Sequence, residues 1–157
     1  MEKSMLSELQ KEEILELISL KQEGAYWDFK KEWYEDGKQS DLLHDIICMA
    51  NRDAYIIIGI DEENDYCVND MTNAENRKST QMLVDFVRSK KFAGGIRPRV
   101  MVETMQLETG MIDIIVIKNG YSTPYVLEES YRGVNANNIY TRVMDSNTPK
   151  NKTAEIS

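Results

Sequence analysis

Acidic and basic side chains alternate with large aromatic residues in the segment EGAYWDFKKEW, residues 23–33. Its polar residues Glu23, Asp28 and Lys30 could serve a ligand, because carboxylates bind cations and a lysine pairs with phosphate or with a neighbouring acid. The alternation with period two predicts a strand that places Asp28 and Lys30 together on its polar face. A solvated face, in which these charges carry little energy, is the alternative, and the residue types leave both open.

A second group of candidate residues is basic, and no acid interrupts it between Phe86 and Val102. Such a stretch suits contacts to phosphates, which position nucleic acid without reading its sequence. Basic residues also favour the last turn of a helix, where they complement the helix dipole. The candidates for nucleic-acid binding are Lys30, Arg88, Lys90, Lys91, Arg97 and Arg99, joined by Arg132 and Arg142 if the C-terminal strands lie nearby.

Other catalytic and metal-binding patterns are weak. His44 and Cys48 could share one helix face, but His44 is the only histidine, so Cys48 is interpreted as a small buried residue. Gly37-Lys38 does not form a phosphate-binding P-loop, because position 32 is Glu rather than Gly. The sequence therefore argues against an ATPase and against a Ser-His-Asp hydrolase.

Length and charge bound the remaining possibilities. The chain has 157 residues, which fits one domain with its own core, and carries a formal net charge of -8. That charge argues against a protein whose main work is to coat DNA, although a local basic patch is compatible with it. No apolar run reaches the roughly 18–20 residues of a membrane helix, and the first residues lack the apolar core of a signal peptide. We expect a cytoplasmic protein with no membrane partner.

Periodicity predicts the elements that must position these residues. Helices are expected over 4–22, with Ser4 or Ser7 as N-cap, and over 41–51 and 75–91. Strands are expected over 26–33, over the apolar run 54–60, and in a hairpin that joins 99–107 to 111–118. Shorter strands follow at 125–128 and 138–143, and the polar residues 146–157 are expected to form a flexible tail. This order predicts one α+β domain over 1–157, with a mixed β-sheet packed against about three helices.

The ordered motifs resemble the Schlafen-type AlbA-like domain. The resemblance runs from Glu23 to Ile156 and rests on Glu23-x4-Asp28-Phe29-Lys30, Ala50-Asn51, the run Ile56–Asp61, Pro98, the hairpin, Pro124 and the strand Ile139–Arg142. Two features depart from the family pattern. The turn Asn51-Arg52-Asp53-Ala54 lacks the usual pair of glycines, and Asp28 stands where Glu is commoner.

The resemblance implies three alternatives for function. Bacterial members are described as DNA-binding or transcription-related, and some are labelled ATP-binding, which implies a regulatory module that interacts with DNA or RNA. Animal Schlafens include RNA-cleaving enzymes that use three carboxylates and a divalent metal. Glu23, Asp28 and Asp61 match those positions, so Mg²⁺ or Mn²⁺ would be the cofactor of an endoribonuclease; no other cofactor is predicted. The third alternative is a protein-interaction or homo-oligomerisation domain whose site has decayed.

Overall fold

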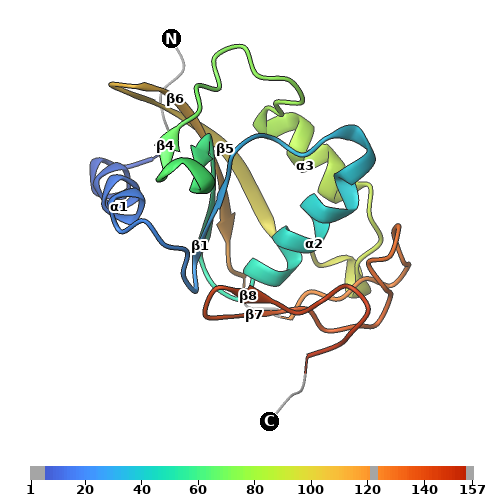
Figure 1. Ribbon diagram of the computed structural model, residues 1–157. Helices are drawn as coiled ribbons and strands as arrows, with labels where there is room; N and C mark the ends of the chain where they lie inside the picture. Colours follow the sequence, from blue (N-terminus) through green and yellow to red (C-terminus); the bar gives the residue numbers. More distant parts are fainter. Residues whose placement is uncertain (1–5, 121–123, 155–157) are drawn as a thin grey trace.

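A mixed four-stranded β-sheet lies at the centre of the computed structural model, which describes residues 6–120 and 124–154 (Figure 1). The strands lie in the order β1 (Trp27–Lys30), β2 (Ala54–Ile58), β6 (Gly110–Lys118) and β5 (Arg99–Leu107). Strand β1 runs parallel to β2, whereas the β2–β6 and β6–β5 pairs are antiparallel. The predicted mixed sheet and the predicted β5–β6 hairpin are both present.

α-Helices cover both faces of this sheet (Figure 1). Helix α1 (Glu8–Ser19) packs on one face, and α2 (Gln39–Met49) and α3 (Thr80–Arg88) pack on the other. Three short 3₁₀ helices and two small sheets complete the α+β domain: η1 (Asp36–Lys38), η2 (Glu62–Asn64), η3 (Ala93–Gly95), β3 (Ile60–Asp61) with β4 (Cys67–Val68), and β7 (Arg142–Val143) with β8 (Ser146–Asn147). The predicted fold class, an α+β domain with three helices, is confirmed.

Helix α1 begins at a capping box. The Ser7 hydroxyl accepts a hydrogen bond from the Gln10 N–H at 3.1 Å, and the Gln10 side chain accepts one from the Ser7 N–H at 3.0 Å. Ser7 is therefore the N-cap, and the other candidate, Ser4, lies outside the described residues. The helix is shorter than the predicted 4–22 because Leu20 is its C-cap and Lys21 has a positive φ of 52°.

Strand β1 is also shorter than its aromatic pattern suggests. Trp27 and Phe29 pack in the core beneath α1, so they face away from α2 as the alternation predicts. Trp33 was expected on the same face but lies in the core on the α2 and α3 side. The strand ends at Lys30, so the alternation does not continue to Trp33, and the Trp33 indole N–H donates to the buried Asp113 at 2.7 Å.

The C-terminal segment is attached to α2 as far as the structure describes it. The sequence favours fraying from residue 146, but Ser146–Asn147 form strand β8 and the Asn147 amide donates to Asp45 at 3.0 Å. Lys150 pairs with Asp41, and the Ala154 N–H donates to Ile139 at 2.7 Å. Polar residues hold this segment because their partners on α2 and on residue 139 supply hydrogen bonds that composition does not reveal.

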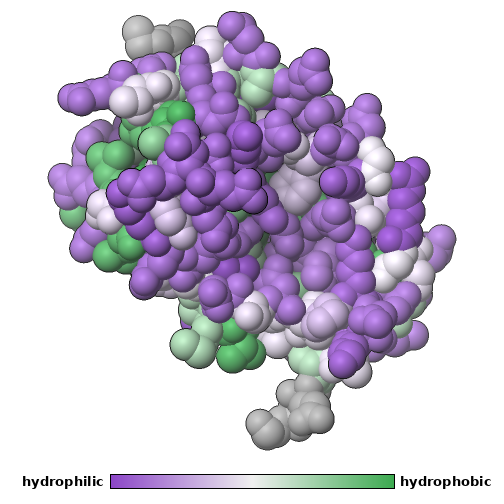
Figure 2. All heavy atoms as spheres, viewed as in Figure 1, coloured by the Kyte–Doolittle hydropathy of each residue, from purple (hydrophilic) through white to green (hydrophobic). Residues whose placement is uncertain are grey.

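Hydrophilic side chains cover most of the molecular face in Figure 2. Hydrophobic surface gathers at the left of that view, over α1, where Leu9, Leu15 and Leu20 are exposed. None of the helices within residues 6–120 and 124–154 combines the length and the apolar character needed to cross a membrane.

Candidate functional site

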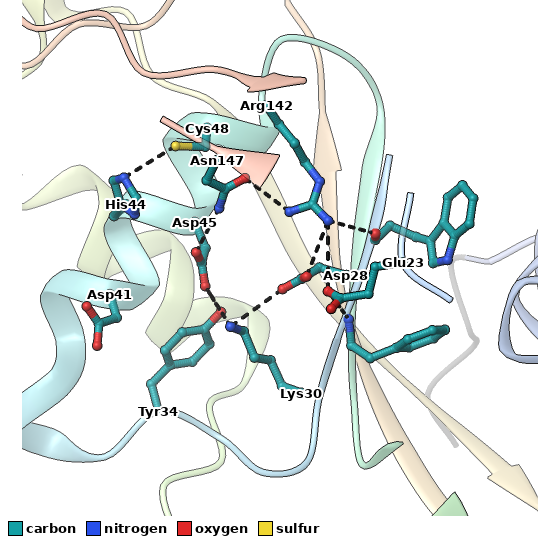
Figure 3. A network of polar contacts seen from close by, with 12 residues as sticks. Glu23, Asp28, Lys30, Tyr34, Asp41, His44, Asp45, Cys48, Arg142 and Asn147 are labelled. Atoms are coloured by element: carbon teal, nitrogen blue, oxygen red, sulfur yellow. Dashed lines mark hydrogen bonds and ion pairs between the residues drawn. The ribbon is translucent and has the colours of Figure 1, made fainter. Parts of the chain in front are cut away.

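Two of the three predicted carboxylates meet at a buried arginine. Arg142 comes from β7, and one of its guanidinium nitrogens, Nη2, lies 3.3 Å from Asp28 and 3.8 Å from Glu23 (Figure 3). The Arg142 side chain is only 2% exposed, so it contacts no solvent-borne ligand in this arrangement. The guanidinium neutralises the two acids from within the protein.

The same side chains satisfy the free backbone edge of β1. The Glu23 carboxylate accepts from the Phe29 N–H at 3.2 Å, and Arg142 donates to the Trp27 carbonyl at 3.2 Å and to the Gly24 carbonyl at 2.9 Å. Gly24 is required here because a Cβ at this position would lie 2.1 Å from the Trp27 ring. Glu23 and Arg142 therefore close an edge that would otherwise be open to pairing with another strand.

Lys30 links Asp28 to Asp45, an acid that the sequence did not single out. Its ammonium lies 3.5 Å from Asp28 and 3.3 Å from Asp45, which α2 presents to the polar face of β1. The Tyr34 hydroxyl donates to Asp45 at 2.6 Å. Asn147 closes the cluster, since it accepts from Arg142 at 3.0 Å and donates to Asp45 (Figure 3). Lys30 and Arg142, which the sequence predicted to contact phosphates, thus pair with carboxylates of the protein.

Burial and charge together set the protonation of this cluster. Burial raises the pKa of Asp28 above its ordinary value, and Lys30 and Arg142 oppose that rise. Burial alone would lower the pKa of Lys30, but the carboxylates of Asp45 and Asp28 outweigh it and raise that pKa. Burial, followed by the Asp45 charge, raises the pKa of Tyr34 well above its ordinary value. Lys30 is therefore a cation and Tyr34 a neutral donor at neutral pH.

Asp61, the third predicted carboxylate, lies apart from Glu23 and Asp28. Asp28 is opposite Ile56 in the parallel register, but β2 ends at Ile58, Gly59 has a positive φ of 109°, and Asp61 lies in β3 of a second sheet. Its carboxylate caps η2 by accepting from the Glu63 N–H at 3.2 Å, and it lies 3.8 Å from the Lys31 ammonium. Asp61 therefore has its own structural partners at the far end of the sheet.

These residues do not fit the divalent metal that the family of RNA-cleaving enzymes implies. Within residues 6–120 and 124–154, no group of three or more His, Cys, Asp or Glu is placed so that it could hold a metal ion. Glu23 and Asp28 instead share the Arg142 cation, while Asp61 faces Lys31. The arrangement offers a closed ion-pair network rather than open oxygen ligands.

The other predicted basic residues lie together around the end of α3. Arg88 ends the helix, Lys90 and Lys91 follow it, and Arg99 opens β5, with Arg88, Lys91 and Arg99 exposed. Arg97 is used differently, because its guanidinium donates to the Gly95 carbonyl at 3.1 Å and the Lys90 carbonyl at 3.2 Å. It shapes the loop that carries the neighbouring cations.

The loop 128–137 brings an aromatic ring and a further cation to these residues. The Lys90 ammonium lies 3.7 Å from the centroid of the Tyr131 ring and 4.8 Å from that of Phe86. The Arg132 guanidinium lies 5.3 Å from the Tyr131 ring. Burial, aided by the charge of Arg132, lowers the pKa of Lys90. Arg132 thus belongs with the basic residues of α3, whereas Arg142 does not.

Three residues of the ion-pair network escaped sequence reasoning: Tyr34, Asp45 and Asn147. Asp45 carried the clearest signal, because it lies on α2 among buried positions and is itself 8% exposed. An acid on the inner face of an apolar helix needs a buried partner. Asn147 lies in the segment expected to fray, and nothing local marks it.

Cys48 behaves as the sequence suggested. It is fully buried, its sulfur lies 3.5 Å from the His44 ring, and that ring contacts the Thr148 carbonyl at 2.6 Å. Burial raises the pKa of the Cys48 thiol to about 12. A neutral thiol at this position is a packing group, not a nucleophile.

Comparison with known proteins adds a family to this geometry. The family model described as "Schlafen, AlbA_2" matches residues 23–151. Comparisons with curated proteins and with solved structures gave no significant match. The matched span includes the ion-pair network and all the basic residues around α3, and it covers most of the chain. The chain therefore belongs to the Schlafen AlbA_2 family.

Proposed function

We propose that this protein is a nucleic-acid-binding regulatory module whose contact surface lies at the end of α3. The surface, here called the basic surface, comprises Arg88, Lys90, Lys91, Arg99 and Arg132. Family membership supports a nucleic-acid-related role at the level of the family. The proposal assigns that role to residues outside the carboxylate cluster.

One observation carries the proposal: five cations without an ion-pair partner among the described residues lie around one end of α3. Within the described residues, none of them forms an ion pair. Eight other basic residues do, namely Lys11, Lys21, Lys30, Lys31, Arg77, Lys118, Arg142 and Lys150. In a chain with net charge -8, cations that form no ion pair are the groups available to phosphates.

The nuclease alternative has no comparable support in the structure. A cation already lies between Glu23 and Asp28, and the third acid is paired elsewhere. We therefore infer binding without turnover. The buried network then has a structural role, in which it attaches the β7–β8 hairpin and α2 to the edge of β1.

The proposal is tested by charge reversal at an exposed member of the basic surface. Lys91→Glu should weaken binding of a labelled DNA or RNA oligonucleotide about tenfold at low salt, because it removes a phosphate contact and adds repulsion. Fluorescence anisotropy measures the affinity. Lys21→Glu is the matched control, since it changes the net charge equally but follows α1, on the opposite face of the sheet.

Two outcomes would count against the assignment. Unmodified protein that binds neither DNA nor RNA at low salt would remove the proposed function. Equal losses from Lys91→Glu and Lys21→Glu would show that net charge, rather than the basic surface, governs binding.

A further inference from the structure

We propose that the basic surface binds single-stranded nucleic acid and stacks one unpaired base on Tyr131. This inference rests on the proposed function and specifies its substrate class. It concerns a hollow between the end of α3 and the loop 128–137, lined by Ser89, Lys90, Lys91, Glu129, Ser130 and Tyr131.

The size and lining of the hollow suit a planar, partly polar group. Its volume is about 420 Å³, within the range of small-ligand sites. Tyr131 is partly exposed, and its ring meets Phe86 edge to face with the centroids 6.2 Å apart. The Lys90 ammonium lies over this ring, 3.7 Å from its centroid, so a base stacks there when Lys90 moves from the ring to a phosphate. An aromatic ring beside cations is the arrangement that proteins use to stack successive bases of a single strand.

The charges divide the hollow into a base position and phosphate positions. Glu129 lines it and would repel a phosphate, whereas its carboxylate can accept hydrogen bonds from the amino group of a base. The cations Lys91 and Arg132 are exposed near Tyr131 and can meet the phosphates on either side of the base. The base therefore enters the hollow and the backbone follows its rim.

The turn that carries Tyr131 has a conformation that its residue types do not favour. Tyr131 and Val134 exchange backbone hydrogen bonds at 2.9 and 2.8 Å around the pair Arg132-Gly133, and both residues of the pair have positive φ, 41° and 89°. Such a turn ordinarily takes Asn, Asp or Gly at its first position. An arginine there costs conformational energy, and such costs concentrate at functional sites.

The aromatic and basic parts of the site are held together before any ligand binds. The Glu128 N–H donates to the Lys91 carbonyl at 2.8 Å, and the Ala93 N–H donates to the Val126 carbonyl at 2.8 Å. These bonds attach the segment before Tyr131 to the segment that carries Lys90 and Lys91. A preformed site loses less conformational entropy when a flexible single strand binds.

A duplex cannot use this site fully. Its bases are stacked on one another, so it presents phosphates to the basic surface but no free base to Tyr131. The inference therefore separates two contributions: Lys91 contributes to binding of both single and double strands, and Tyr131 contributes only to single strands.

The test compares one sequence as a single strand and as a duplex, with anisotropy as the readout. Tyr131→Leu should weaken single-strand binding about tenfold and leave duplex binding unchanged, whereas Tyr131→Phe should retain single-strand affinity because it keeps the ring. Lys91→Glu should weaken both. Thermal unfolding of each variant shows that the fold is kept.

The inference is overturned if Tyr131→Leu affects single strand and duplex equally, or affects neither. In that case Lys91→Glu still tests the proposed function. If Lys91→Glu lowers the affinity and Tyr131→Leu does not, the proposed nucleic-acid binding stands and only the base-stacking inference is refuted. If Tyr131→Leu lowers stability, Tyr131→Phe decides: a tenfold loss of single-strand affinity with the ring retained would also overturn the inference.

Discussion

Arg142 occupies the place in this protein where the family resemblance implied a metal ion. Its guanidinium neutralises Glu23 and Asp28 and at the same time donates to the Trp27 carbonyl, so charge and backbone are satisfied by one side chain. Removing one partner of a buried pair leaves the other charge without compensation, which costs more than the pair itself contributes. We therefore predict that this ion-pair network stabilises the folded protein.

Arg142→Met should lower the free energy of unfolding by about 3–5 kcal/mol, because Asp28 then remains buried without its guanidinium partner. The double variant Arg142→Met with Asp28→Asn should regain part of that loss, since the uncompensated charge is gone. Urea denaturation measures both. Arg52→Met, at an exposed residue that forms no ion pair within the described part of the chain, is the control, and a similarly small change for Arg142→Met would contradict the prediction.

At the scale of elements, α3 is positioned by contacts at and before its N-terminal end. The Thr80 hydroxyl accepts from the Val102 N–H at 2.9 Å and donates to the Val102 carbonyl at 3.1 Å, which joins the start of the helix to the edge of β5. Before the helix, Arg77 donates to the buried Asp113 of β6 from two nitrogens, each at 2.8 Å. Trp33 and Thr104 also donate to Asp113, so this carboxylate ties three segments together.

Arg77→Met should destabilise the protein by about 3 kcal/mol, because Asp113 keeps two donors but loses its only cation among the described residues. Hydrogen exchange should quicken most in the segment 69–79, which Arg77 anchors. Lys38 is exposed and forms no ion pair with any residue that the structure describes, so Lys38→Met should change stability by less than about 0.5 kcal/mol. Unchanged exchange in that segment would show that Arg77 is not the anchor.

For the whole molecule, the contrast between overall and local charge should govern the proposed nucleic-acid binding. The chain carries a net charge of -8, yet five cations that form no ion pair among the described residues lie around the end of α3. The acidic remainder repels phosphates elsewhere, so a bound strand should touch only a short stretch of surface. Binding should therefore be weak and confined, and its salt dependence should report the few contacts.

The logarithm of the binding constant for a single strand should fall with the logarithm of salt concentration with a slope of about -3.5, from the five exposed or partly exposed cations of the basic surface. Lys91→Glu should make the slope shallower by about 0.7, the value for one contact. Lys21→Glu should leave it unchanged. A slope near zero for the unmodified protein would show that phosphates do not dominate binding.

Local pattern was sufficient for much of the fold. The apolar run Ala54–Ile58 forms the buried central strand β2, and the two runs around Glu108-Thr109 form the β5–β6 hairpin, because burial and turn chemistry act over a few residues. The same local reasoning placed Trp27 and Phe29 in the core. It overextended α3, which begins at Ser79 as N-cap, because the preceding segment is held by Arg77 rather than by helical bonds.

The sequence by itself determined the α+β class, the family motifs and the polar face that Asp28 and Lys30 share. Only the tertiary structure decided which residues meet that face: Asp45, Asn147 and Arg142 reach it, and Asp61 does not. The physical reason is that a strand pattern specifies sides but not register or neighbours. In the β1–β2 register, Asp61 lies beyond the residue that is opposite the end of β1. The C-terminal segment packs beside α2, and this places Arg142 between Glu23 and Asp28 of EGAYWDFKKEW.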